Sequence, residues 1–250
     1  MRLALLVLGL LVLASPARAQ ESASDEARHI LPIRYADRPL TLPEGTFRLD
    51  QSIVLRVGSG GFGLSGPNAL FVGLTDWLEV GVAWPWTRDP SLVATARVGH
   101  SPVADLGFRV QATVPAVTTG DTDLVVSMPI VFRLGHIARI ATGVTGDFLL
   151  TQTVRPILRI PLSIVFSGSE RNLVGIDASL SLADYRFWHG GVGLFYAHTA
   201  ATPLRPFGEL RVGAAFDFAS AAGPSTSSSV TFSTYVAFSF WTTVNPIAWP

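Results

Sequence analysis

Residues 104–114 have the sequence Ala-Asp-Leu-Gly-Phe-Arg-Val-Gln-Ala-Thr-Val, in which apolar and polar positions alternate. Ala104 and Leu106 fall on one face of an extended chain, whereas Asp105 and Arg109 fall on the other. Successive side chains of a β-strand point to opposite faces. The segment is therefore predicted to be a strand with one apolar and one polar side.

The same alternation recurs along the chain. It is clear in residues 47–57, 78–86, 124–133, 155–164, 174–182, 188–196, 209–218 and 229–240, and weaker in 68–75, 91–98 and 137–147. These segments predict about twelve strands, within a range of about 10–14, each close to the length that membrane strands have. After the N-terminal segment, no run approaches the ~18 uninterrupted apolar residues of a spanning helix. The fold class is therefore all-β.

Composition excludes several functions. The 250 residues have a formal net charge of zero, so no strong field would attract nucleic acid. Cys is absent and every basic residue is Arg, which excludes thiolate metal sites, cysteine catalysis and lysine Schiff bases. We expect no enzyme activity, no cofactor and no metal site.

Two kinds of protein fit the alternation, a soluble secreted β-protein and a membrane barrel. Only 14% of the residues are charged, and the apolar faces of the strands are nearly free of charge, as a lipid-facing surface must be. Aromatic residues also gather near strand ends, where they would mark the membrane interfaces. These are Trp77, Trp84, Trp86, Trp188, Phe218, Phe240 and Trp241. The favoured fold is a transmembrane antiparallel up-and-down β-barrel.

The chain is predicted to have four parts. Residues 1–19 have the charged start, apolar core and small-residue end of a secretory signal peptide. Residues 20–45 are polar and proline-containing, and form either a periplasmic arm or a segment tucked into the barrel mouth. Residues 46–241 form the barrel, and residues 242–250 form a C-terminal tail. The predicted location is the bacterial outer membrane.

Joint lengths predict the orientation of the barrel. Residues 58–67 and 115–122 form long joints, whereas residues 75–76 and 135–136 form tight ones. Short turns face the periplasm in bacterial outer-membrane barrels. An even number of strands would then place both termini in the periplasm. The expected partners are the lipid bilayer and the barrel-assembly machinery, with Phe240 or Trp241 as an internal assembly signal.

One segment resembles a known group of proteins. Residues 72–82, Val-Gly-Leu-Thr-Asp-Trp-Leu-Glu-Val-Gly-Val, resemble a G-L-T-D-x-L-E-V-G hairpin of poorly characterised bacterial outer-membrane barrels. Residues 34–43 are similar to the leader of such proteins. One branch of the group is associated with the meta-pathway of phenol degradation, and another is described as putative transporters. The resemblance implies an outer-membrane barrel with a transport role and no catalytic residues.

The polar faces supply the candidate lumen residues, in which positive and negative charges nearly cancel. They are Arg48, Arg56, Glu79, Arg97, Asp105, Arg109, Arg133, Arg139, Asp147, Arg155, Arg159, Asp177, His189, Glu209, Arg211 and Asp217. The local excess at Arg155 and Arg159 is a candidate carboxylate-binding constriction, and the alternative is a salt-bridged, rigid lumen.

The predicted function is passive movement of a small, unidentified solute. A closed structural or adhesive barrel is the first alternative, since paired lumen charges would leave little open bore. An outer-membrane hydrolase is the second. It would need a histidine close to Ser or Asp at the outer rim.

Overall fold

The protein forms a single antiparallel β-sheet. A computed structural model describes residues 34–58, 61–86, 89–113, 123–149, 155–183, 186–201, 207–219 and 229–243. A short 3-10 helix, η2 (Tyr35–Asp37), precedes the sheet. The strands are β1 (Thr46–Gly58), β2 (Gly61–Ser65), β3 (Asn68–Thr75), β4 (Leu78–Ala83), β5 (Ser91–His100), β6 (Ala104–Thr113), β7 (Asp123–Leu134), β8 (Ala138–Leu149), β9 (Arg155–Ser167), β10 (Asn172–Ala183), β11 (Arg186–Ala201), β12 (Phe207–Ala219) and β13 (Ser229–Thr243).

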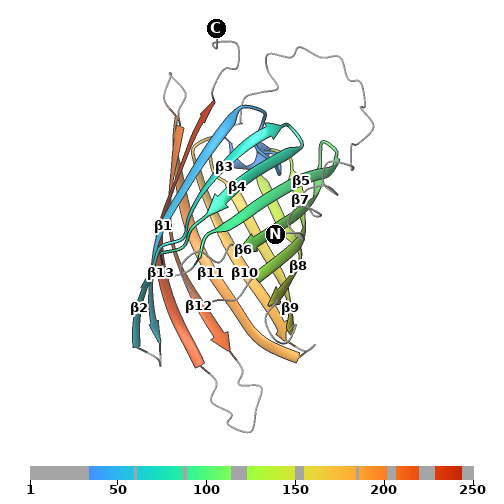
Figure 1. The fold of residues 1–250 in the computed structure, drawn as a ribbon. Helices are drawn as coiled ribbons and strands as arrows, with labels where there is room; N and C mark the ends of the chain where they lie inside the picture. Colours follow the sequence, from blue (N-terminus) through green and yellow to red (C-terminus); the bar gives the residue numbers. More distant parts are fainter. Residues whose placement is uncertain are drawn as a thin grey trace, which may run out of the picture.

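The sheet closes on itself. From β3 to β13, each strand pairs with the next one in the chain, and β1 pairs with β13 from Thr46↔Thr243 to Gly58↔Thr231. Figure 1 shows the tilted strands wrapping into a barrel, with β1 beside β13. Closure satisfies backbone hydrogen bonds that would otherwise lie at open sheet edges. The predicted up-and-down β-barrel is confirmed.

Thirteen strands fill twelve positions in this barrel. β2 and β3 pair with the same edge of β1, β2 with residues 54–58 and β3 with residues 47–51. Together they form one strand interrupted at Gly66 and Pro67. The predicted number of about twelve is thus confirmed, but the prediction of a long loop over residues 58–67 is wrong.

Packing explains the interruption. Pro67 has no N–H to donate, although its carbonyl still accepts a hydrogen bond from the Ser52 N–H at 3.1 Å. Gly66 lies against the Trp86 indole so closely that a Cβ there would be 2.2 Å from the ring. The strand breaks where one residue cannot donate and its neighbour cannot carry a side chain.

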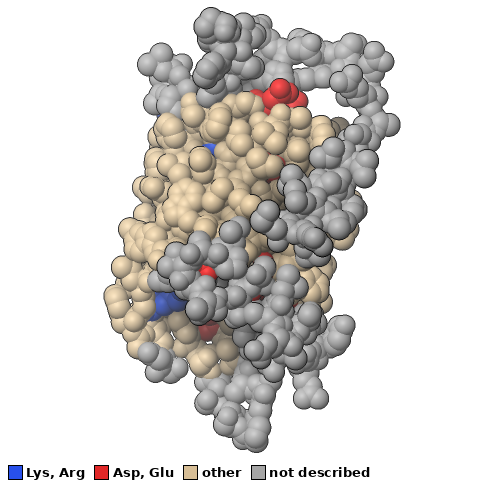
Figure 2. Space-filling model, in the orientation of Figure 1, with Lys and Arg blue, Asp and Glu red and all other residues tan. Residues whose placement is uncertain are grey.

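The outer wall of the barrel is apolar. Ile53, Leu194 and Phe216 are each more than half exposed, and many other large apolar side chains of the strands are exposed with them. Figure 2 shows one side of the wall, covered almost entirely by uncharged residues. A soluble protein would bury such a surface, whereas a lipid-facing wall requires it. No helix among the described residues is long and apolar enough to cross a membrane. The protein is a transmembrane β-barrel, as its sequence predicts.

Most of the predicted interface aromatics that the structure describes lie on the outer wall or at its edge. Trp84 and Trp86 are exposed by 37% and 54%, and Phe218 by 43%. Phe240 and Trp77 are half-buried, with Trp77 in the turn between β3 and β4. The side chain of Trp188 lies outside the described part of the chain.

Trp241 corrects the prediction. It is only 5% exposed and packs inside the barrel with Leu42, Phe71 and Val93. The reason is strand parity, because Trp241 is the register partner of Arg48, which faces the lumen. Its nearness to the strand end suggested an interface role, but its odd position in β13 turns it inward.

Candidate functional site

The N-terminal segment occupies one end of the barrel. That end carries the turns at residues 76–77, 101–103 and 135–137 and is called here the short-turn end. Asp37 contacts the 135–137 turn, where its carboxylate lies 2.8 Å from the His136 imidazole Nδ1. The predicted arm over residues 20–45 therefore has its described part, residues 34–45, in the barrel mouth. We call residues 34–45 the plug.

Two buried carboxylates of the wall hold the plug backbone. The Leu40 N–H donates to Asp105 Oδ2 at 3.0 Å, and the Leu42 N–H donates to Glu79 Oε2 at 3.1 Å. Asp105 and Glu79 are 1% and 3% exposed. Hydrogen bonds to buried charged acceptors are among the stronger ones in proteins, so these two anchors fix the path of the plug.

Arg38 anchors the plug to the opposite wall. Its guanidinium donates to Glu209 Oε2 at 2.8 Å and to Thr199 Oγ1 at 3.3 Å, and it lies 4.7 Å from the centre of the Trp241 ring. The residue is only 4% exposed. A buried charge is tolerated when it is paired and hydrogen-bonded, as it is here. Arg38 therefore joins the plug to β11, β12 and β13.

Gly73 gives the plug room. The Gly45 N–H donates to the Gly73 carbonyl at 2.9 Å, and a Cβ on Gly73 would be 2.1 Å from the Pro43 carbonyl oxygen. The carbonyl oxygens of Leu42 and Pro43 are the nearest clashing atoms, and these backbone atoms cannot move aside without moving the plug. The close approach of plug and wall thus depends on the missing side chain.

Replacing Gly73 by Ala should displace the plug. Since the chain has no cysteine, Thr41→Cys provides a single reporter thiol at a position that is 1% exposed. We expect this thiol to react with a maleimide at least several times faster in the Gly73→Ala background. Gly63→Ala is the control, because a Cβ at Gly63 has nothing within 4 Å, and it should leave the rate unchanged. Equal labelling in both backgrounds would show that the plug is not packed on Gly73.

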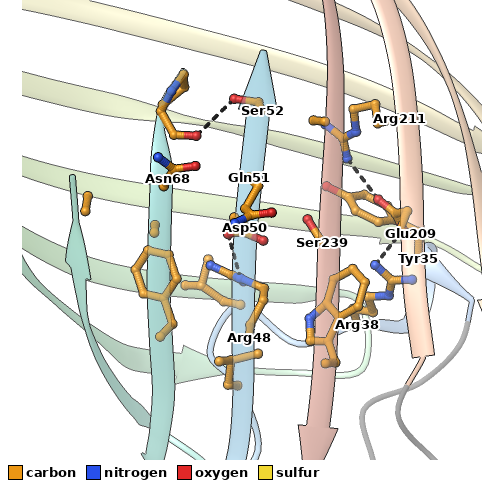
Figure 3. Close-up of a pocket in the computed structure, with 18 of the residues that line it drawn as sticks. Tyr35, Arg38, Arg48, Asp50, Gln51, Ser52, Asn68, Glu209, Arg211 and Ser239 are labelled. Atoms are coloured by element: carbon orange, nitrogen blue, oxygen red, sulfur yellow. Dashed lines mark hydrogen bonds and ion pairs between the residues drawn. The ribbon is translucent and has the colours of Figure 1, made fainter. Parts of the chain in front are cut away.

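A cavity lies between the plug and the wall. Its volume is about 590 Å³, and plug residues 38–42 line it together with parts of β1, β3, β12 and β13. Figure 3 shows Arg38 and Arg211 on either side of Glu209, and Arg48 beside Asp50. The Arg48–Asp50 separation is 2.9 Å, and the Arg211–Glu209 separation is 3.4 Å. The cavity is thus charged, partly aromatic and roomy enough for water and a small solute.

A second cavity of about 260 Å³ lies beside β6, β7 and β8. Arg109 lines both cavities. Its guanidinium lies 5.8 Å from the centre of the Phe71 ring. Arg109 therefore borders both of these cavities in the lumen.

Several other predicted lumen residues form ion pairs between neighbouring strands. Asp105 pairs with Arg133 and also contacts His100 Nδ1 at 2.6 Å. Asp147 pairs with Arg159 at 2.6 Å, so Arg159 is not a free cation. The proposed Arg155–Arg159 constriction is not assessed further, because the side chain of Arg155 lies outside the described part of the chain.

The remaining candidates occupy separate positions. Arg56 is exposed near the far end of β1 and donates to Ser65 Oγ at 3.2 Å. Arg97 and Asp177 are half-buried and do not line the larger cavity. Arg139 is 8% exposed and lies over the Tyr35 ring at 4.8 Å.

One histidine lies near an acidic residue at the end of the barrel opposite the plug. His189 Nε2 is 3.8 Å from Asp217 Oδ1, and Ser181 is the cross-strand partner of His189. A catalytic base is oriented by a hydrogen bond of about 2.6–3.2 Å, and this separation is longer. The pair is a weak ion pair when His189 is protonated. The described groups of His, Asp and Glu include none that could hold a metal ion.

The plug residues that complete the site were not predicted from the sequence. Tyr35 and Arg38 carry no periodic signal, because they precede the first strand. The available signal was the polar, proline-containing composition of residues 20–45, which indicated a non-strand segment beside the barrel. Composition does not identify Glu209 as the partner of Arg38, because that contact spans 171 positions.

Comparison by sequence finds no matching family model and no matching characterised protein. Comparison by structure finds outer-membrane barrels. The chain is similar to the NanC porin, at 10% identity over 76% of this chain and 98% of that one, with a TM-score of 0.55. It is also similar to an outer membrane channel from Pseudomonas putida F1, at 10% identity over 90% and 100% of the two chains, with a TM-score of 0.53. At this identity the likeness shows the shared barrel fold.

Proposed function

We propose that the protein is a passive outer-membrane channel for small solutes, narrowed at its short-turn end by the plug. The observation that carries the proposal is the charged cavity of about 590 Å³ inside an apolar-walled barrel. Pores select and pass solutes through polar and charged linings of this kind. The structural likeness to a porin and to an outer membrane channel supports the proposal.

The cavity favours the channel over a closed structural barrel. Small barrels without a transport role fill the interior with side chains. Here Arg48, Arg109 and Arg211 border open space. Burying charged groups in a filled interior costs free energy, so a purely structural barrel would be expected to carry uncharged side chains at these positions. The salt-bridged lumen and the channel are thus compatible, because ion pairs brace the wall around the cavity.

Solute entry into liposomes tests the proposal. Liposomes that contain the refolded chain should swell in an isotonic solution of a pentose faster than in one of a trisaccharide, because the plug leaves only a narrow passage. Protein-free liposomes are the control. Swelling at the protein-free rate in both solutes, by protein that still shifts on heating in a gel, would contradict the channel and support the closed barrel.

The finer assignments are proposals as well. The resemblance of residues 72–82 to barrels of the phenol meta-pathway group supports a transport role, and membership of that group stays a prediction. Insertion by the barrel-assembly machinery, with Phe240 as an internal signal, also stays a prediction. The hydrolase alternative receives little support from the His189–Asp217 geometry, and an enzymatic role is not part of the proposal.

A further inference from the structure

Positive charge is concentrated at the larger cavity. Five arginines line it, whereas Asp50 and Glu209 are the only carboxylates among its lining residues. The arginines are Arg38, Arg48, Arg109, Arg139 and Arg211. The near-cancellation of charge along the whole chain therefore does not hold at this site, where an excess of positive charge lies beside the plug.

The two carboxylates are already engaged. Asp50 accepts from Arg48 at 2.9 Å, and Glu209 accepts from Arg38 at 2.8 Å and from Arg211 at 3.4 Å. Within the described part of the chain, no carboxylate lies within 4.0 Å of the guanidinium groups of Arg109 and Arg139. Arg109 and Arg139 are therefore the two lining arginines without a direct ion-pair partner.

Arg139 is the more strongly buried of the two. It is 8% exposed, and one of its nitrogens donates to the Tyr35 carbonyl at 3.3 Å. Its Nε is buried and has no hydrogen-bond partner. A buried, unpaired donor on a charged group costs free energy, and a guanidinium cannot relieve that cost by losing its proton. That nitrogen is closed to solvent and to any solute in the cavity. Arg109 is only half-buried and borders both cavities, so it is the unpaired cation that an anion in the cavity can reach.

The rest of the lining indicates what kind of anion fits. The rings of Phe71 and Tyr235 and the side chains of Val54 and Ala83 line the same cavity. Ligand sites commonly combine apolar walls with a few charged groups that fix the orientation. Guanidinium groups match the planar, two-oxygen geometry of a carboxylate.

We propose that this cavity binds a small organic monocarboxylate with an apolar body, and that Arg109 holds its carboxylate. This proposal gives the class of solute that the channel would carry, and its biological role rests on the proposed channel function. Its chemistry, by contrast, depends only on the cavity. Binding and conduction can therefore be measured separately.

Benzoate and benzamide form a matched pair of probes, because they have nearly the same shape but only benzoate is charged. Titration calorimetry of the refolded full chain in detergent should show benzoate binding at least tenfold more tightly than benzamide. Arg109→Gln should weaken benzoate binding at least tenfold. Arg159→Gln is the control, because Arg159 pairs with Asp147 and does not line this cavity, and it should bind benzoate as the unchanged chain does.

The comparison of the two probes needs no variant, so it stands even if a substitution prevents folding. Equal affinity for the two probes, or binding of neither, would overturn the proposed site. Benzoate binding by a protein that conducts no ions would retain the site and overturn the channel. Conduction without charge-selective binding would do the reverse.

Discussion

Deleting residues 34–43 should raise the single-channel conductance several-fold. The deletion removes the part of the plug that contacts both walls of the lumen, including Arg38, Leu40 and Leu42. Conductance depends on the narrowest cross-section, and the described structure places the plug across one end of the barrel. Planar-bilayer recordings of the deleted and intact chains would measure the change.

The barrel itself should survive this deletion. Glu79, Asp105 and Glu209 would lose plug partners, but water entering the widened lumen can hydrate them, which limits the cost of leaving them unpaired. Retained heat-modifiable migration on a gel would verify folding. Arg159→Gln serves as a control for altered lumen charge, since its side chain is 48% exposed, and its conductance should stay close to that of the intact chain. An unchanged conductance after deletion would show that the plug is not the constriction.

Asp105→Asn should cost about 3 kcal/mol of unfolding free energy, as expected when one partner of a buried ion pair is removed. The Asp105 side chain is 0% exposed and Arg133 is 10% exposed, so the substitution would leave a buried guanidinium without its counter-charge. It would also weaken the acceptors for His100 and for the Leu40 N–H. Denaturant unfolding in detergent, followed by tryptophan fluorescence, would measure the loss.

Asp147→Asn is the matched control for that substitution. Asp147 also pairs with an arginine across neighbouring strands, but its side chain is 16% exposed and Arg159 is 48% exposed. Exposed ion pairs contribute about 0–1 kcal/mol, so the control should lose about 1 kcal/mol or less. Similar losses in the two variants would mean that burial does not set the strength of these pairs.

The alternation of side chains was enough to predict most of the strands. Residues 104–114 were predicted as a strand and β6 covers residues 104–113, with Asp105 buried inside the barrel. The weaker segments at 68–75, 91–98 and 137–147 correspond to β3, β5 and β8. A period of two is a local property, so it appears in a single sequence.

Features that leave no alternation in the sequence could not be predicted. β2 was missed because Gly61 and Gly63 have no side chains to alternate, and the strand exists through its pairing with β1. The site was missed because it depends on a contact between distant parts of the chain, since Arg38 meets Glu209 only after β12 has taken its place in the closed barrel. Trp241 was assigned to the wrong surface, because proximity to a strand end was given more weight than parity.

The most direct test of the central claim is single-channel recording of the intact, refolded chain, on a sample that shows heat-modifiable migration. The structure predicts steady conductance steps that are small for a barrel of this size, because the plug narrows a lumen that still contains a cavity of about 590 Å³. A heat-modifiable barrel that gives no steps would contradict the claim that this protein is a channel.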